Sequence, residues 1–125
     1  MTAAFAEIGV VLRDYFDALH FCAVAKLQRV FHPKAIYATA DESPLLYRTM
    51  DEYMPVVAAR QSPASRGESR KDHIDSIEIA GENTAMARLR CSIGTRDFVD
   101  FLTLVRTEGR WQVIAKVFQI IENRN

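Results

Sequence analysis

The sequence predicts an α+β fold in which three N-terminal helices pack on one face of a curved antiparallel sheet. Across residues 3–60, apolar residues recur mainly every three or four positions, which is the period of a helix. Across residues 73–121 they recur every second position, which is the period of a strand. The polar residues 61–70 between these halves are too few for a domain linker. The whole chain, residues 1–125, is therefore expected to form a single domain.

The first two helices follow from an apolar stripe and a helix-ending signal. Residues 3–20 carry a stripe at helical spacing, formed by Phe5, Ile8, Leu12, Tyr15, Phe16 and Leu19. Gly9 interrupts this helix at a cost of about 1 kcal/mol relative to alanine, so close packing is expected there. A shorter helix at about 23–31 ends before Pro33, because the residue before a proline is pushed out of the helical region.

The third helix has a clear starting signal. Thr49 and Glu52 match a capping box, in which each side chain bonds to the backbone of the other residue. The helix is expected to run from there to about Arg60. Pro55 removes one helical hydrogen bond, which predicts a kink or a later start.

Six strands are expected, at residues 35–40, 45–48, 73–79, 84–93, 97–106 and 111–121. The last two form a hairpin, because Gly109 stands where a tight turn needs a positive φ. By strict alternation, one face of the last strand carries Trp111, Val113, Ala115 and Val117, and the other carries Gln112, Ile114, Lys116 and Phe118. Neither face is purely polar, so both sides of the sheet are expected to be covered.

Charge and composition exclude several classes of function. Sixteen basic and sixteen acidic residues give a net charge of zero, so neither a nucleic acid nor an anionic membrane is an expected partner. No apolar run approaches the ~18 residues that a membrane span needs, and no signal peptide is recognisable, so the expected location is cytoplasmic. Cys22 and Cys91 are expected to be reduced thiols. Neither they nor the three histidines show metal-ligand spacing, so no metal or cofactor is expected.

The order of elements and three motifs resemble one known superfamily. The motifs are Phe31-His32-Pro33-x-Ala35, Phe98-x-Asp100-Phe101-Leu102-x-Leu104 and Trp111-x-Val113-Ile114-x-Lys116-Val117-Phe118. With the helices in front, they resemble the nuclear-transport-factor-2-like (NTF2-like) superfamily, a cystatin-like cone, and are most similar to its putative lumazine-binding group. The resemblance implies a pocket between sheet and helices, a small apolar or heterocyclic ligand, and a homodimer formed through the sheet face. The sequence departs from the group at Cys22-Ala23, where relatives carry Gly-Asp and an aspartate caps the second helix.

Tyr15 is a candidate catalytic residue by this resemblance. Similar ketosteroid isomerases place an oxyanion-hole tyrosine at this point of the first helix, where a phenol stabilises a developing oxyanion. The alternative is a core tyrosine whose hydroxyl finds a carbonyl. The isomerases carry their aspartate base at the position of Thr39, and threonine is no base at neutral pH. This substitution argues against steroid-isomerase chemistry.

Asp100 is the second candidate, because it lies inside an apolar strand. A buried carboxylate has to be paired or protonated, and Arg88, Arg90 and Lys116 on neighbouring strands are possible partners. One hypothesis is a polar cluster of Asp100, Arg90 and Lys116 that holds an anionic or carbonyl-bearing ligand on the pocket floor. The alternatives are a structural salt bridge and a residue at a dimer surface.

Three functions are consistent with these features of the sequence. The first is a small-molecule-binding protein of unassigned activity, whose pocket is expected to be lined by Tyr15, Tyr37, Tyr53, Arg90, Asp100, Lys116 and Phe118. The second is a lyase, isomerase or cyclase that uses Tyr15 and Asp100 on an enolisable ketone. The third is a non-catalytic interaction module with an exposed apolar face around Trp111, Val113 and Val117.

Overall fold

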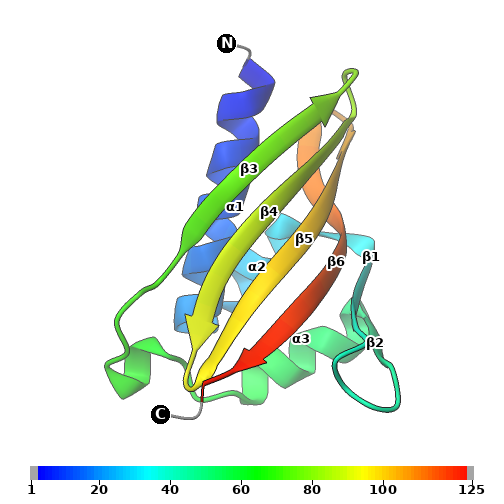
Figure 1. The fold of residues 1–125 in the computed structure, drawn as a ribbon. Helices are drawn as coiled ribbons and strands as arrows, with labels where there is room; N and C mark the ends of the chain where they lie inside the picture. Colours follow the sequence, from blue (N-terminus) through cyan, green and yellow to red (C-terminus); the bar gives the residue numbers. More distant parts are fainter. Residues whose placement is uncertain (1–2, 124–125) are drawn as a thin grey trace.

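The computed structural model describes residues 3–123, which form three α-helices, one 3-10 turn and six strands (Figure 1). The helices are α1 (Ala3–Phe21), α2 (Val24–Val30) and α3 (Met50–Ala59), and the 3-10 turn is η1 (Ala64–Arg66). The strands are β1 (Phe31–Thr39), β2 (Leu46–Thr49), β3 (His73–Ala80), β4 (Thr84–Ile93), β5 (Arg96–Thr107) and β6 (Arg110–Glu122). They form one sheet in the order β2-β1-β6-β5-β4-β3.

The helices cover one face of the sheet, called the inner face below, and the opposite face is called the outer face. In Figure 1 the sheet lies in front and bends across α1, with α2 and α3 behind it. The largest fully buried side chains come from both layers, namely Tyr15, Tyr53, Phe31, Ile8, Leu12, Leu27, Leu89, Leu102, Leu104, Val57 and Val113. The predicted α+β architecture is confirmed. None of the helices in residues 3–123 is long and apolar enough to cross a membrane.

Helix α3 begins as its sequence predicts. The Thr49 hydroxyl accepts from the Glu52 amide at 3.4 Å, and a Glu52 carboxylate oxygen accepts from the Thr49 amide at 2.9 Å. Pro55 lies inside the helix and does not delay its start. Helix α2 has no such cap, because Ala23 stands at its N-cap position and makes no side-chain hydrogen bond.

The sheet differs from the expected antiparallel one at β1. This strand runs antiparallel to β2 and parallel to β6, whereas β3, β4, β5 and β6 pair antiparallel in succession. It begins at Phe31, directly after α2, rather than at residue 35. Its register with β6 shifts between Phe31 and Ile36, around Pro33, which has no backbone N–H to donate to the ladder.

Strict alternation fails in β6 because of a β-bulge. Thr103 faces Ala115 and Leu104 faces Val113, so Ile114 is an extra residue on β6. A bulge of this kind changes which face the following side chains occupy. Val113 before the bulge and Lys116 after it both lie on the inner face, with 0% and 5% exposure.

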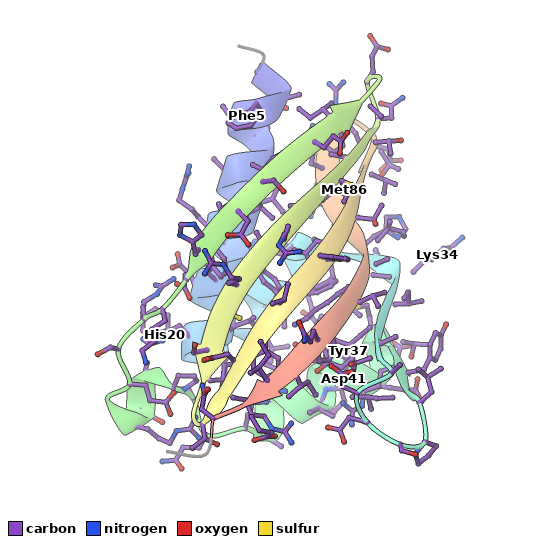
Figure 2. The ribbon with its side chains drawn as sticks, in the orientation of Figure 1. Phe5, His20, Lys34, Tyr37, Asp41 and Met86 are labelled. Atoms are coloured by element: carbon purple, nitrogen blue, oxygen red, sulfur yellow. The ribbon has the colours of Figure 1, made fainter. Side chains whose placement is uncertain are left out.

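The predicted apolar face of Trp111, Val113 and Val117 is therefore wrong. Trp111 and Val113 are buried at 4% and 0% exposure, whereas Val117 is 48% exposed on the outer face. Across β4, β5 and β6, the exposed apolar residues of the outer face are Met86, Phe101, Val117 and Ile121. Figure 2 labels Met86 on this face and shows Lys34 projecting from β1 away from the rest of the molecule.

Candidate functional site

A buried hydrogen bond joins the two candidate catalytic residues. The Tyr15 hydroxyl donates to Asp100 Oδ2 at 2.6 Å, and both side chains are 0% exposed. Tyr15 comes from α1 and Asp100 from the inner face of β5, opposite Phe118. Burial, followed by the nearby charge of Asp100, raises the pKa of Tyr15 well above its usual value, so the phenol stays protonated at neutral pH. The other carboxyl oxygen, Oδ1, is buried and has no hydrogen-bond partner among residues 3–123.

Lys116 is the buried cation beside this pair. The β6 bulge brings it to the inner face, two pairing positions from Asp100. Its Nζ lies over the rings of Tyr15, Tyr37 and Phe118, at 5.2, 5.1 and 5.1 Å from their centroids. Contacts between a cation and ring faces at such distances are attractive. In the part of the chain that the structure describes, no hydrogen-bond acceptor or ion-pair partner reaches this ammonium within the usual limits.

The charge state of Lys116 follows from two opposed effects. Burial lowers the pKa of its ammonium, but the combined electrostatic effect of Asp100, Tyr53, Tyr37 and Cys91 outweighs burial and raises the pKa above its usual value. The side chain is therefore protonated at neutral pH. It can attract an acceptor or an anion, but it has no free electron pair with which to attack a carbonyl.

Arg90 does not belong to this cluster, so the predicted group of Asp100, Arg90 and Lys116 is wrong in one member. Arg90 and Arg88 lie on the outer face and both bond to Asp75, at 2.8 and 3.1 Å. Inner and outer residues alternate along β4, and Arg90 falls on the same side as Arg88. Of the three basic residues considered as partners, only Lys116 shares a face with Asp100.

A cavity of about 160 Å³ opens between the helices and the inner face. Its lining residues are Leu19, Tyr37, Tyr53, Arg60, Cys91, Ile93, Arg96, Phe98 and Lys116. Tyr37 and Tyr53 form one wall as a stacked pair, with ring centroids 4.2 Å apart and planes inclined by 23°. Among the predicted ligand-binding residues, Tyr37, Tyr53 and Lys116 line this cavity, whereas Tyr15, Asp100 and Phe118 are not among its lining residues.

Two arginines that line the cavity were not predicted from the sequence. Arg60 directly follows α3, and Arg96 begins β5. Both stand at ends of elements, where no periodicity indicates which way a side chain points. Arg96 is ion-paired with Glu122 at 2.6 Å and Glu42 at 3.5 Å.

Neither a carboxylate nor a histidine is among the described residues that line the cavity. Burial raises the pKa of the Cys91 thiol to about 12, so its nucleophilic thiolate form is scarce. Thr39 is 1% exposed and its hydroxyl accepts from the Asp41 amide at 3.1 Å. The arrangement is suited to binding an acceptor beside aromatic rings.

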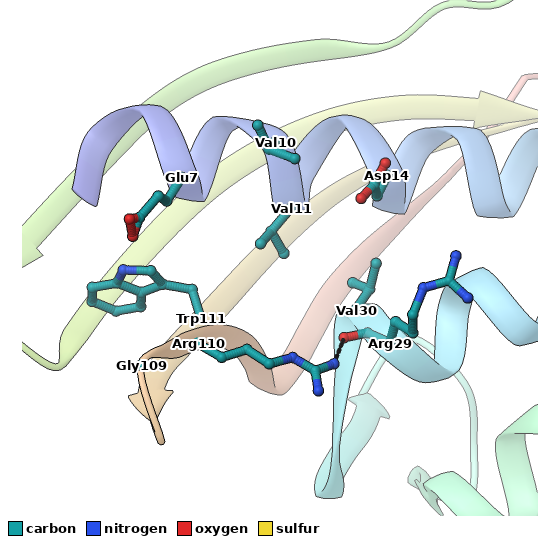
Figure 3. A pocket seen from close by; sticks show the side chains of 9 residues that line it. All are labelled: Glu7, Val10, Val11, Asp14, Arg29, Val30, Gly109, Arg110 and Trp111. Atoms are coloured by element: carbon teal, nitrogen blue, oxygen red, sulfur yellow. Dashed lines mark hydrogen bonds between the residues drawn. The ribbon is translucent and has the colours of Figure 1, made fainter. Parts of the chain in front are cut away.

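A larger groove of about 420 Å³ lies elsewhere, between α1, α2 and the β5–β6 turn (Figure 3). Valine side chains line it together with both signs of charge, and Arg110 donates across it to the Arg29 carbonyl at 3.0 Å. The indole Nε1 of Trp111 is buried beside it with no partner within residues 3–123. Despite its size, this groove contains none of the predicted site residues, so the smaller cavity is the better candidate.

A family model identifies the family of the chain, and similar solved structures share its fold. Residues 3–119 match the family model described as "Putative lumazine-binding". An NTF2-like protein of unknown function from Shewanella baltica OS155 is 23% identical, with a TM-score of 0.84, and the similarity covers 98% of this chain and 99% of that one. Another from Silicibacter pomeroyi DSS-3 is 24% identical, with a TM-score of 0.80 and coverage of 97% and 100%.

A third similar structure is a ketosteroid isomerase-like protein from Erwinia carotovora atroseptica SCRI1043. It is 12% identical, with a TM-score of 0.77, and the similarity covers 98% of this chain and 99% of that one. At these identities the likeness to solved structures shows the fold alone. No curated protein matches the chain.

Proposed function

Because the chain belongs to the putative lumazine-binding family, we propose that it binds one small planar molecule, apolar or heterocyclic, in the cavity between the helices and the inner face. The observation that carries this proposal is the Lys116 ammonium, which is 5% exposed, lines the cavity and has no acceptor among the described residues. An ammonium that lines a cavity without a protein acceptor can donate to an acceptor that a ligand supplies. The stacked Tyr37–Tyr53 pair offers a flat wall for a ring.

The size of the cavity limits the ligand. An apolar protein cavity of about 150 Å³ takes up a benzene ring, and this one measures about 160 Å³. It therefore fits one aromatic or heterocyclic ring with a small substituent. A two-ring ligand such as lumazine would require lining side chains at the mouth, such as Phe98, to move aside.

Binding without turnover is favoured over an enzyme. The Tyr15 hydroxyl already donates its hydrogen bond to Asp100, and the Thr39 hydroxyl cannot act as a base at neutral pH. The one feature that favours a lyase, isomerase or cyclase is the unpartnered Oδ1 of Asp100, which could accept a proton from an enolisable ketone. Asp100→Asn would then abolish turnover while the melting temperature stays nearly unchanged, and a large loss of stability would favour a structural role.

The test is ligand-induced thermal stabilisation with lumazine, uracil and single-ring aromatic compounds. The variant Ile93→Trp fills the cavity mouth, and Leu45→Trp, at an exposed residue outside the cavity, is its matched control. The proposal predicts that a ligand raises the melting temperature of the wild type and of Leu45→Trp, but not of Ile93→Trp. If no compound stabilises the wild type, or if Ile93→Trp responds equally, the binding role is wrong.

The same proposal includes a homodimer through the outer face, in preference to docking of an unrelated protein. Phe101 and Val117 are 50% and 48% exposed there, side by side on paired strands. The outer face also carries the Asp75–Arg90 ion pair, so it holds both signs of charge for contact with its own copy. The zero net charge of the chain adds little repulsion between copies. A cytoplasmic location remains a prediction.

A further inference from the structure

The charged side chains that line the cavity are all cationic. Its three cationic residues are Arg60, Arg96 and Lys116, and no carboxylate is among the lining residues that the structure describes. Asp100 lies near Lys116 and offsets its charge. Glu122 and Glu42 offset the charge of Arg96.

Arg60 is the remaining cation. Within residues 3–123 its side chain has no ion-pair or hydrogen-bond partner. It lies close enough to the interior to act on Tyr53: burial raises the pKa of that phenol, while the charges of Lys116 and Arg60 oppose the rise. Three carboxylates thus stand near three cations, but none of the carboxylates in residues 3–123 pairs with Arg60. Its guanidinium donors are therefore available to an anionic group in the cavity.

We propose that the ligand is a planar monoanion, such as an aromatic carboxylate or an acidic heterocycle, whose charged group is held by Arg60. A guanidinium presents paired N–H donors that match a carboxylate or a similar planar anion. The ring lies against the Tyr37–Tyr53 pair, and the Lys116 ammonium donates to an acceptor on the ring or on the anionic group. This inference rests on the proposed function, since it assigns a charge class to the ligand of the same cavity.

The test compares benzoate with benzamide, its neutral counterpart of nearly equal shape, by calorimetric titration of the whole chain. Benzylamine, protonated at neutral pH, serves as the cationic probe. We expect benzoate to bind at least about tenfold more tightly than benzamide, which corresponds to about 1.4 kcal/mol, and benzylamine to bind weakest. Rising salt concentration should weaken benzoate binding, because Arg60 is only half-buried and its charge is screened.

Arg60→Gln should remove the preference for benzoate, and Arg60→Lys should restore part of it. Arg106→Gln removes an exposed arginine that lines no part of the cavity and serves as the matched control, with the preference unchanged. The single indole N–H resonance of Trp111 reports on the groove of Figure 3, so a probe that binds in the cavity should leave it unshifted.

Three outcomes would overturn the charge assignment. These are equal binding of benzoate and benzamide, an unchanged preference in Arg60→Gln, and no binding of benzoate while a neutral ring compound binds. In each case the proposed function itself still stands if the neutral compound stabilises the wild type and fails with Ile93→Trp. Loss of all binding to wild type and control variants alike would remove both proposals.

Discussion

The Tyr15 hydroxyl and Asp100 Oδ2, 2.6 Å apart, join α1 to β5 across 85 positions of sequence in the centre of the protein. Together with Lys116 they place a donor, a carboxyl group and an ammonium in an interior formed mainly by apolar side chains. Such a group is stabilising only while its members stay together, because each would be costly alone. The first predictions concern this interdependence.

Tyr15→Phe should destabilise the protein by about 1.5–3 kcal/mol, the range for hydrogen bonds to charged groups. The substitution leaves both oxygens of Asp100 without a partner, since Oδ1 already has none among the described residues. Urea unfolding measures the loss, with Tyr47→Phe at a tyrosine that is 53% exposed as control. An equal, small effect of both substitutions would mean that the Tyr15–Asp100 bond contributes nothing.

Lys116→Met should cost about 3–5 kcal/mol, because it leaves the Asp100 carboxylate buried without a countercharge. In Asp100→Asn the ammonium loses its compensating charge instead. The double variant should therefore be more stable than the sum of the two single losses predicts, by at least about 1 kcal/mol. Chemical denaturation of the four proteins gives this coupling energy. Additive losses would show that the two charges do not interact.

Stability should fall steeply in alkaline solution. The folded state raises the pKa of Cys91 from 9.0 to about 12, mainly by burial. Between these values the unfolded chain binds fewer protons than the folded chain, so the free energy of unfolding decreases as the pH rises. The contribution is fully present below pH 9 and reaches a slope of about 1.4 kcal/mol per pH unit within the window.

Tyr15, Tyr53 and Lys116 add to this loss above about pH 10, because their pKa values are raised in the folded state as well. Urea unfolding at pH 8, 9 and 10 in separate buffers measures the slope. Cys91→Ala should flatten it between pH 9 and 10, and Cys22→Ala is the matched control. A slope that Cys91→Ala leaves unchanged would contradict the assignment to this thiol.

Gly9→Ala should stabilise the protein by about 1 kcal/mol, the difference in helix propensity between the two residues. The sequence predicted close packing at Gly9, but an added Cβ would meet only Arg13 Nη1, at an ordinary 3.6 Å. Gly109→Ala provides the contrast, because Gly109 has a φ of 76° in the two-residue turn between β5 and β6. Thermal unfolding should show a gain for the first variant and a loss for the second.

A charged substitution on the outer face tests the proposed dimer directly. Light scattering should give twice the chain mass of 14.2 kDa for the wild type. Val117→Glu should give the mass of one chain with the fold retained, since Val117 is 48% exposed. Val10→Glu, at an equally exposed valine on α1, should remain a dimer. A wild type that is monomeric at high concentration would refute the assembly.

The sequence was a reliable guide wherever one local signal decided the structure. The helical spacing of apolar residues and the Thr49–Glu52 box determined the helices, and alternation determined β4 and β5. In β3 a register shift between Ile74 and Ser76 interrupts the alternation. The parallel pairing of β1 with β6 was missed because it joins distant segments, and no local pattern encodes which strands become neighbours.

The site was predictable in part. Alternation in β4 already separates Arg90 from the inner residues, so its exclusion from the Asp100 group could have been deduced. The place of Lys116 on the inner face could not be derived from strict alternation, because the Ile114 bulge reverses the pattern just before it. Arg60 lies at a helix end, where sequence carries no orientation signal.

The extra residue at Ile114 also affects how relatives can be compared with this chain. In a homologue that lacks this extra residue, or carries it one position away, a different set of side chains would face the cavity. This would hold even if the amino-acid sequence of its last strand matched that of β6. An alignment guided by sequence alone would then pair Lys116, which faces the interior, with a residue of the homologue that faces solvent. Transfer of a ligand preference between members of the family therefore requires that this single irregularity be located first.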